Sequence, residues 1–160
     1  MAEGEFALVR ENLEMGLSKM ASWVGDHDLY AMLADAAAQQ RDEAALRRYA
    51  PLAEETAVRY KHILYQAIAQ RAWGVAHRLA GDYAEAETSF NRALQFFEAL
   101  GTRWQIGRTL MELAELAQAQ ADSTRARSCF SSAALEFESL DAKPDAARAR
   151  TALSALTPGT

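Results

Sequence analysis

Apolar residues recur every three or four positions through most of the chain, and this spacing predicts helices. In the stretch 68–80, bulky apolar side chains alternate with small ones, which suits a helix packed closely on a neighbour. Gly81 suits the left-handed turn that ends such a helix, and Asp82 can accept the free amides of the next one. Apolar residues continue on one broad face to Leu100. The pattern predicts an antiparallel helix pair over 68–100, in which each helix buries the apolar face of the other.

The same unit recurs at a period of 40 residues. Three aspartates precede the second helix of each pair, and three apolar residues close those helices at the same interval: Asp42, Asp82 and Asp122, then Tyr60, Leu100 and Leu140. Within the first of these second helices Pro51 predicts a kink or a break, because it lacks an amide and clashes with the preceding turn. We therefore expect three homologous helix pairs along the chain.

These pairs and their flanking segments form one expected domain over 4–156. Its parts are an N-terminal half-repeat at 4–24, helix pairs at 28–60, 68–100 and 102–140, and a closing helix at 144–156. The tail 157–160 is expected to be disordered. A chain of 160 residues is long enough to bury the core of a single domain.

Three segments of the central unit carry a family resemblance. Trp73-Gly74, Gly81-Asp82-Tyr83 and Ala86-x3-Phe90-x2-Ala93 together resemble a tetratricopeptide repeat. The resemblance implies an all-α, right-handed superhelical solenoid of antiparallel helix pairs, with about eight helices. The 40-residue period is similar to the repeats of large bacterial signalling ATPases, cyclases and maltose-regulator-type transcriptional regulators, which implies a bacterial signalling context.

Composition and charge narrow the function classes. Half of the residues are hydrophobic and only three are proline, which favours a globular helical protein over a disordered one. The net charge of −5 arises within residues 1–60, and no basic stripe is available for a phosphate backbone, so we expect no nucleic-acid partner. No apolar run approaches the length of a membrane span, and the single cysteine, Cys129, fits a reducing compartment. We expect a cytoplasmic protein without a membrane partner.

The histidines and the cysteine form no recognisable catalytic or metal-binding set. His27 lies between two aspartates but lacks further ligands at a suitable spacing. His62 and His77 are expected to have structural roles, and Cys129 is expected to be an inert thiol beside a core phenylalanine. We predict that the protein is not an enzyme and carries no cofactor or metal.

The resemblance implies that the first helices of the pairs line a concave groove. Residues seven apart on a helix share a side, and the groove then offers these charges: Asp28, Asp35, Arg71, Arg78, Arg108, Glu115 and Arg148. They are either solvating charges or binding groups. In the second interpretation, Arg71, Arg78 and Arg108 grip carboxylates or carbonyls of an extended peptide or helix.

We therefore expect a non-catalytic scaffold or adaptor that binds a peptide or helix of a protein partner. One alternative is a self-assembling homo-oligomer, a homodimer in the simplest case, in which Met20 and Trp23 make the contact. A less favoured alternative is a small-ligand sensor that uses the same groove.

Overall fold

The computed structural model describes residue 8, residues 11–16 and residues 26–156. Within these residues the secondary structure is helical and contains no strand, so the expected all-α class is confirmed. Residue 8 and residues 11–16 are helical, and residues 11–16 are called the N-terminal helix below. The remainder of the expected half-repeat at 4–24, with Met20 and Trp23, lies outside the described residues, as does the tail 157–160.

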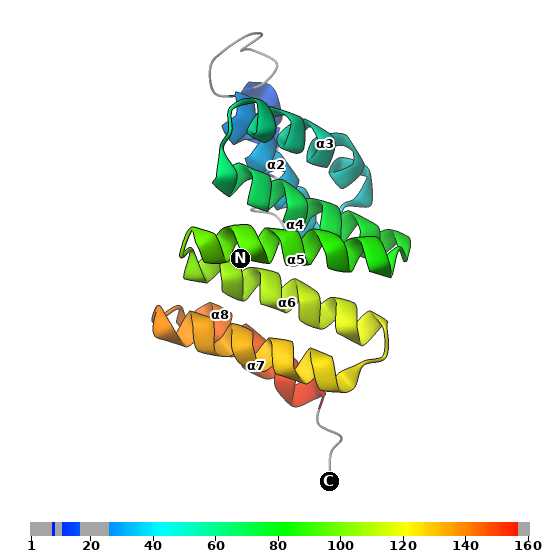
Figure 1. The fold of residues 1–160 in the computed structure, drawn as a ribbon, viewed down its shortest axis with the longest axis vertical. Helices are drawn as coiled ribbons and strands as arrows, with labels where there is room; N and C mark the ends of the chain where they lie inside the picture. Colours follow the sequence, from blue (N-terminus) through cyan, green and yellow to red (C-terminus); the bar gives the residue numbers. More distant parts are fainter. Residues whose placement is uncertain (1–7, 9–10, 17–25, 157–160) are drawn as a thin grey trace.

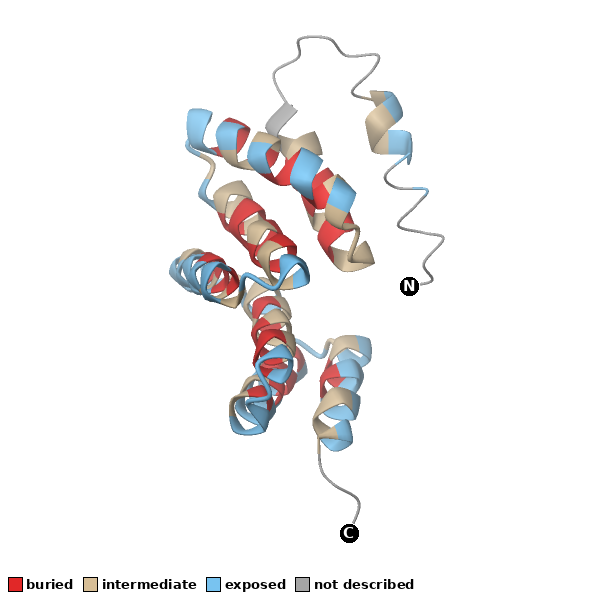
Figure 2. Ribbon diagram, turned by 90° about the vertical axis from the view of Figure 1, so that its right-hand side faces the viewer, coloured by how far each residue is buried: buried red, intermediate tan, exposed pale blue. Residues whose placement is uncertain are grey.

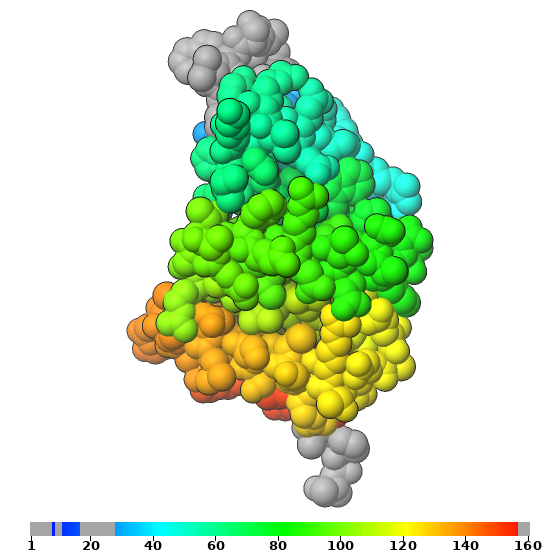
Figure 3. Space-filling model, viewed as in Figure 1, coloured from blue at the N-terminus to red at the C-terminus, as the bar shows by residue number. Residues whose placement is uncertain are grey.

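Seven further helices follow one another in the described part of the chain. They are α2 (Asp26–Gln40), α3 (Glu43–Arg59), α4 (Ile63–Ala80), α5 (Tyr83–Ala99), α6 (Arg103–Ala119), α7 (Ser123–Ser139) and α8 (Lys143–Ala155). Consecutive helices run antiparallel and form an elongated stack, with the N-terminal helix near one end and α8 at the other (Figure 1). The layers follow the order of the sequence along the long axis (Figure 3). The handedness of the superhelix stays a prediction.

Every helix from α2 to α7 ends in the same kind of turn. One residue with positive φ occurs every twenty residues: Arg41, Lys61, Gly81, Gly101, Ala121 and Asp141. At Gly81, where φ is 85°, the amides of residues 81 and 82 donate to the carbonyl oxygens of Arg78 and His77, which closes a Schellman-type cap. The predicted left-handed turn is therefore confirmed. The equal spacing of these turns and the 17 or 18 residues of each helix from α3 to α7 keep the successive pairs in register.

The aspartates at the helix starts behave differently from one another. The side chains of Asp42 and Asp122 accept hydrogen bonds from the amides of Ala45 and Arg125, at 3.0 and 2.9 Å. Asp82 makes no such bond, so the expected side-chain cap there is wrong. Its ψ of 66°, against 93° at Asp42 and 80° at Asp122, departs furthest from the extended backbone that a capping residue needs.

Helix α3 runs without interruption through Pro51, so the predicted break is wrong. A proline inside a helix costs about 3 kcal/mol. Apolar residues are buried on both sides of it, among them Tyr49, Ala50, Ala53 and Ala57, whereas Pro51 itself is exposed. Burial on both sides of the proline offsets the lost hydrogen bond and the steric clash. The kink stays a prediction.

The core consists of aromatic residues on second helices seated against small residues on first helices. A Cβ atom built on Gly74 of α4 would lie 2.4 Å from the ring of Phe90 of α5, and one on Gly107 of α6 would lie 2.8 Å from Phe137 of α7. The buried positions run along the surfaces where helices face each other (Figure 2). This packing holds the first helices α2, α4 and α6 side by side and fixes the positions of their charged residues.

Candidate binding face

Charged side chains of α2, α4 and α6 meet on one side of the stack, which we call the first-helix face. It comprises Asp35 of α2, Arg41 of the following turn, Arg71 and Arg78 of α4, and Arg108, Glu112 and Glu115 of α6. Helical spacing explains why the residues of one helix point to this face: they lie three, four or seven residues apart and therefore share a side of the helix. Five of these seven residues belong to the set predicted from the sequence.

Asp35 is the centre of the first half of this face. Its carboxylate accepts hydrogen bonds from Arg71 at 2.8 Å, from Arg108 at 3.0 and 3.1 Å, and from Gln39 at 3.0 Å. Burial alone would raise the pKa of Asp35, but the positive charges of Arg71 and Arg108 outweigh it and lower the pKa to about 2. The carboxylate is therefore charged at neutral pH and joins α2, α4 and α6.

Arg71 is enclosed, with 1% of its surface exposed. Its guanidinium donates to the Gln105 side-chain oxygen at 2.6 Å and lies 5.1 Å from the centre of the Phe97 ring. Burial and the neighbouring charge of Arg108 lower the pKa of Arg71 to about 10, against the opposing effect of Asp35. The guanidinium thus makes its contacts within the protein and has almost no exposed surface for a partner.

Two glutamates and two arginines form the second half of the face. Arg41 binds Glu112 and Glu115 in bidentate fashion, with distances of 2.8 to 2.9 Å. Arg78 reaches the same two carboxylates at 3.0 and 2.8 Å. Burial and the adjacent Glu112 raise the pKa of Glu115, and the two arginines counteract this effect. Because Arg41 follows α2 and the glutamates lie on α6, these bonds fasten α2 to α6 beside α4.

The charges of the first-helix face therefore satisfy one another. Four guanidiniums face three carboxylates, which leaves a net charge of +1. The side chains of Arg78 and Arg108 are only 12% and 11% exposed. A carboxylate of a partner would have to displace Asp35, Glu112 or Glu115 to bind these arginines directly.

The two remaining residues of the predicted set lie towards the ends of the face. Asp28 of α2 bonds the hydroxyl of Tyr65 of α4, and burial together with this carboxylate raises the pKa of Tyr65. Arg148 of α8 pairs with Asp145 at 2.6 Å while its side chain stays 65% exposed. Of the predicted arginines, Arg148 is thus the one whose charge is accessible.

Three important residues were not predicted from the sequence. Arg41 lies in a turn, more than 70 positions from its glutamate partners, so no local spacing indicates the contact. Glu112 lies one helical turn from both Arg108 and Glu115, and the helical spacing on α6 was a signal for it. Trp104 of α6 is 40% exposed, its ring lies 4.9 Å from the Arg108 guanidinium, and its Nε1 donates to Asp145 at 3.0 Å.

The other candidate residues for chemistry have local structural contacts. His62 stacks on Tyr65 with ring centres 3.9 Å apart, and His77 stacks on Trp73 at 5.5 Å. Burial raises the pKa of the Cys129 thiol, which lowers its reactivity at neutral pH. The described residues include no group of three potential metal ligands. The side chain of His27 lies outside the described residues.

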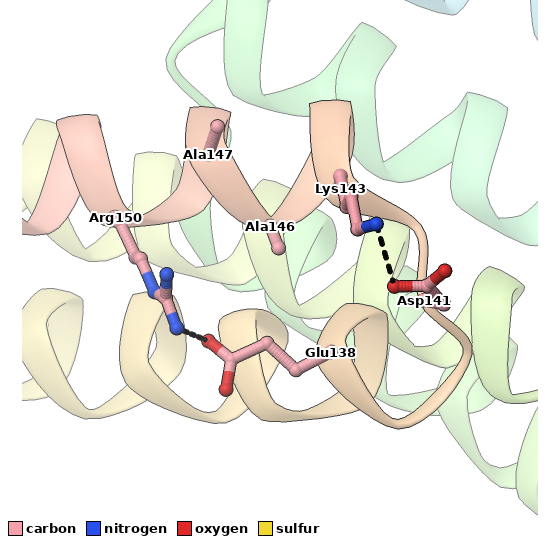
Figure 4. Close-up of a pocket in the computed structure, with 6 residues that line it drawn as sticks. All are labelled: Glu138, Asp141, Lys143, Ala146, Ala147 and Arg150. Atoms are coloured by element: carbon pink, nitrogen blue, oxygen red, sulfur yellow. Dashed lines mark ion pairs between the residues drawn. The ribbon is translucent and has the colours of Figure 1, made fainter.

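A hollow of about 190 Å³ lies away from this face, where α7 turns into α8 (Figure 4). It is lined by Glu138, Asp141, Lys143, Ala146, Ala147 and Arg150. Its charged residues pair across the hollow, Arg150 with Glu138 at 2.6 Å and Lys143 with Asp141 at 3.5 Å. The hollow is shallow and holds paired charges, so it offers no convergent set of groups for catalysis.

Comparison with known proteins supports the repeat architecture. Residues 65–134, which run from α4 into α7, match the family model of the tetratricopeptide repeat. No curated protein matches the chain significantly. Among the described residues, none of the helices has both the length and the apolar character needed to cross a membrane.

Proposed function

We propose that this chain, a tetratricopeptide-like repeat protein, is a non-catalytic scaffold or adaptor that binds a peptide or helix of another protein on its first-helix face. Repeats of this family generally mediate protein–protein interaction and are typically not catalytic. The bacterial signalling context and the cytoplasmic location stay predictions.

The observation that carries the proposal is the cross-linked arrangement of the first-helix face. Asp35, Glu112 and Glu115 each bind arginines from two different elements, so the relative positions of α2, α4 and α6 are set before any partner arrives. A surface ordered in advance loses less conformational entropy on binding, which favours affinity. The charged network thus supplies a rigid support for recognition.

Accessible residues of the types that dominate protein interfaces lie on α2, α6 and α8. Met32 of α2 is 55% exposed, Trp104 of α6 is 40% exposed and the Arg148 side chain of α8 is 65% exposed. Methionine, tryptophan and arginine are enriched in interface cores and energetic hot spots. In this mechanism Trp104 and Met32 bury apolar side chains of the partner, and Arg148 binds a carboxylate or a carbonyl oxygen.

This assignment divides six of the seven predicted groove residues, all except Asp28, into two groups. Arg71, Arg78, Arg108, Asp35 and Glu115 position the helices, and Arg108 also supports the Trp104 ring. Arg148 is assigned to the partner contact. Substituting Arg71 would test folding more than binding, because its guanidinium is buried.

The test compares a variant of the accessible residues with a matched control on the second helices. Trp104→Ala combined with Arg148→Glu should abolish enrichment of specific partners from cell extract. In calorimetry it should weaken the affinity for a purified partner at least about tenfold. The control, Leu135→Ser combined with Arg92→Glu, changes an exposed apolar residue of α7 and an exposed arginine of α5. Both variants should keep the helical circular dichroism. Equal partner affinity of the two variants would place the binding site elsewhere.

A further inference from the structure

The turn between α5 and α6 and the turn between α7 and α8 carry the same short pattern of residues. Each has a glutamate, a leucine two positions later and a basic residue three positions after the leucine: Glu98, Leu100 and Arg103 in the α5–α6 turn, and Glu138, Leu140 and Lys143 in the α7–α8 turn. The corresponding positions between α3 and α4 hold valine, tyrosine and isoleucine. The pattern is therefore specific to two neighbouring turns.

Both turns lie on the same edge of the stack, because consecutive helices run antiparallel (Figure 1). Arg103 at the start of α6 donates to Glu136 near the end of α7 at 2.8 Å, which joins these helices beside the two turns. Leu100 and Leu140 are 43% and 45% exposed. Because Leu100 is exposed although α6, α7 and α8 follow it, exposure is a property of this position in the repeat. It does not depend on which helices come after Leu140.

Two charged residues of the pattern, Glu98 and Lys143, are available to a partner. Both are exposed, and Glu98 makes no ion pair within the described part of the chain. Lys143 reaches Asp141 at 3.5 Å, with side chains that are 82% and 81% exposed (Figure 4). Such an exposed pair contributes little free energy, so Lys143 can exchange it for another carboxylate. The other two charges of the pattern have closer partners within the chain.

The pattern is complementary to itself when two copies meet in opposite directions. An antiparallel arrangement places the leucine of one turn against the leucine of the other, and the glutamate at one end of the pattern faces the basic residue at the other end. In a parallel arrangement, glutamate would face glutamate and the basic residues would face each other. Opposite charges favour the first orientation and like charges disfavour the second. The charges therefore select a second copy of this chain, related by a two-fold axis.

We propose that this edge is a dimer interface, in which the α5–α6 turn of each copy packs on the α7–α8 turn of the other. Leu100 of one copy and Leu140 of the second copy bury each other, and Glu98 pairs with Lys143 across the contact. The two-fold axis makes each of these contacts twice. Removal of the leucines from water supplies affinity, and the ion pairs set the orientation. None of these residues belongs to the partner contact proposed above, so the two interactions are tested separately.

Native mass by light scattering over about a hundredfold range of concentration tests the interface. The wild-type mass should reach that of a dimer and go no higher, because a two-fold contact is closed. Leu100→Asp and Leu140→Asp should each keep the protein monomeric, since each would bury a charge in the interface. The control Leu135→Asp, at a 63% exposed position of α7, should dimerise like the wild type. Helical circular dichroism should be equal in all of these proteins.

Charge reversal tests which residues face each other. Glu98→Lys and Lys143→Glu should each weaken dimerisation at least about tenfold, because like charges then meet twice in the interface. The protein with both changes has opposite charges again and should dimerise like the wild type. An equimolar mixture of the two single variants should form the mixed dimer. The control Glu85→Lys, at an exposed glutamate near the other end of α5, should leave dimerisation unchanged.

A wild-type mass that stays at the monomer value over the whole range would overturn the proposal. Dimerisation of the Lys143→Glu protein equal to that of the wild type would overturn it as well, because a contact between two α5–α6 turns does not use Lys143. Failure of the double charge reversal to restore dimerisation would show that Glu98 and Lys143 are not opposite each other. Each of these results leaves the peptide contact to its own test with the Trp104 and Arg148 variant.

Discussion

Asp35→Asn removes the charge on which the first-helix face depends. In the wild type, one carboxylate binds the guanidiniums of Arg71 and Arg108 at 2.8 to 3.1 Å. Asparagine keeps the size of the side chain but leaves the buried Arg71 without a counterion. Breaking a buried ion pair by removing one partner costs roughly 3–5 kcal/mol, because an uncompensated charge stays in the interior.

The pKa of Asp35 supplies an independent magnitude. It falls from 3.8 to about 2 on folding, which corresponds to roughly 2 kcal/mol of stability at neutral pH. The sign follows from the lowered pKa: the contribution is complete above pH 4 and is lost as pH falls towards 2. The variant should therefore lose about 2–5 kcal/mol at pH 7, and the difference between variant and wild type should shrink between pH 4 and pH 2.

Urea denaturation followed by circular dichroism, repeated at several pH values, measures this difference. The control is Glu55→Gln, which removes a pair with Arg59 in which both side chains are 62% exposed. Its cost should stay below about 1 kcal/mol. Equal costs for the two variants at pH 7, or a cost of Asp35→Asn that does not change with pH, would refute the reasoning that the buried charge stabilises the face.

Two further predictions concern positions where backbone or packing is tight. Gly107→Ala would place a Cβ atom 2.8 Å from the Phe137 ring and should lower the free energy of unfolding by about 1–3 kcal/mol. The double variant with Phe137→Leu should recover part of this loss, so that it costs less than the sum of the two single variants. Additive costs would contradict the steric explanation. Ala121→Gly should stabilise the protein by about 1 kcal/mol in urea denaturation, because Ala121 has a φ of 59° that costs a residue with a Cβ atom. Its control is Ala119→Gly at the end of α6, which should destabilise.

Local patterns were sufficient for the helices and for their repetition. The spacing of apolar residues, the 40-residue interval of Asp42, Asp82 and Asp122, and the turn at Gly81 are properties of short segments, and the structure has helices beginning and ending at these points. The sequence was less informative where packing opposes a local preference. Pro51 remains inside α3 because burial on both sides of it outweighs its local cost.

By itself, the sequence determined that the chain is a stack of helix pairs and which side of each first helix carries charge, because helical periodicity fixes the direction of a side chain. It did not determine how far these charged side chains are buried. Only the tertiary structure decided that Arg71 of α4 is buried against Phe97 of α5 and that Arg41 reaches Glu112 of α6, since these contacts join different helices. The burial of these side chains and their partners far away in the sequence depend on how the helix pairs pack, and no local spacing encodes that packing.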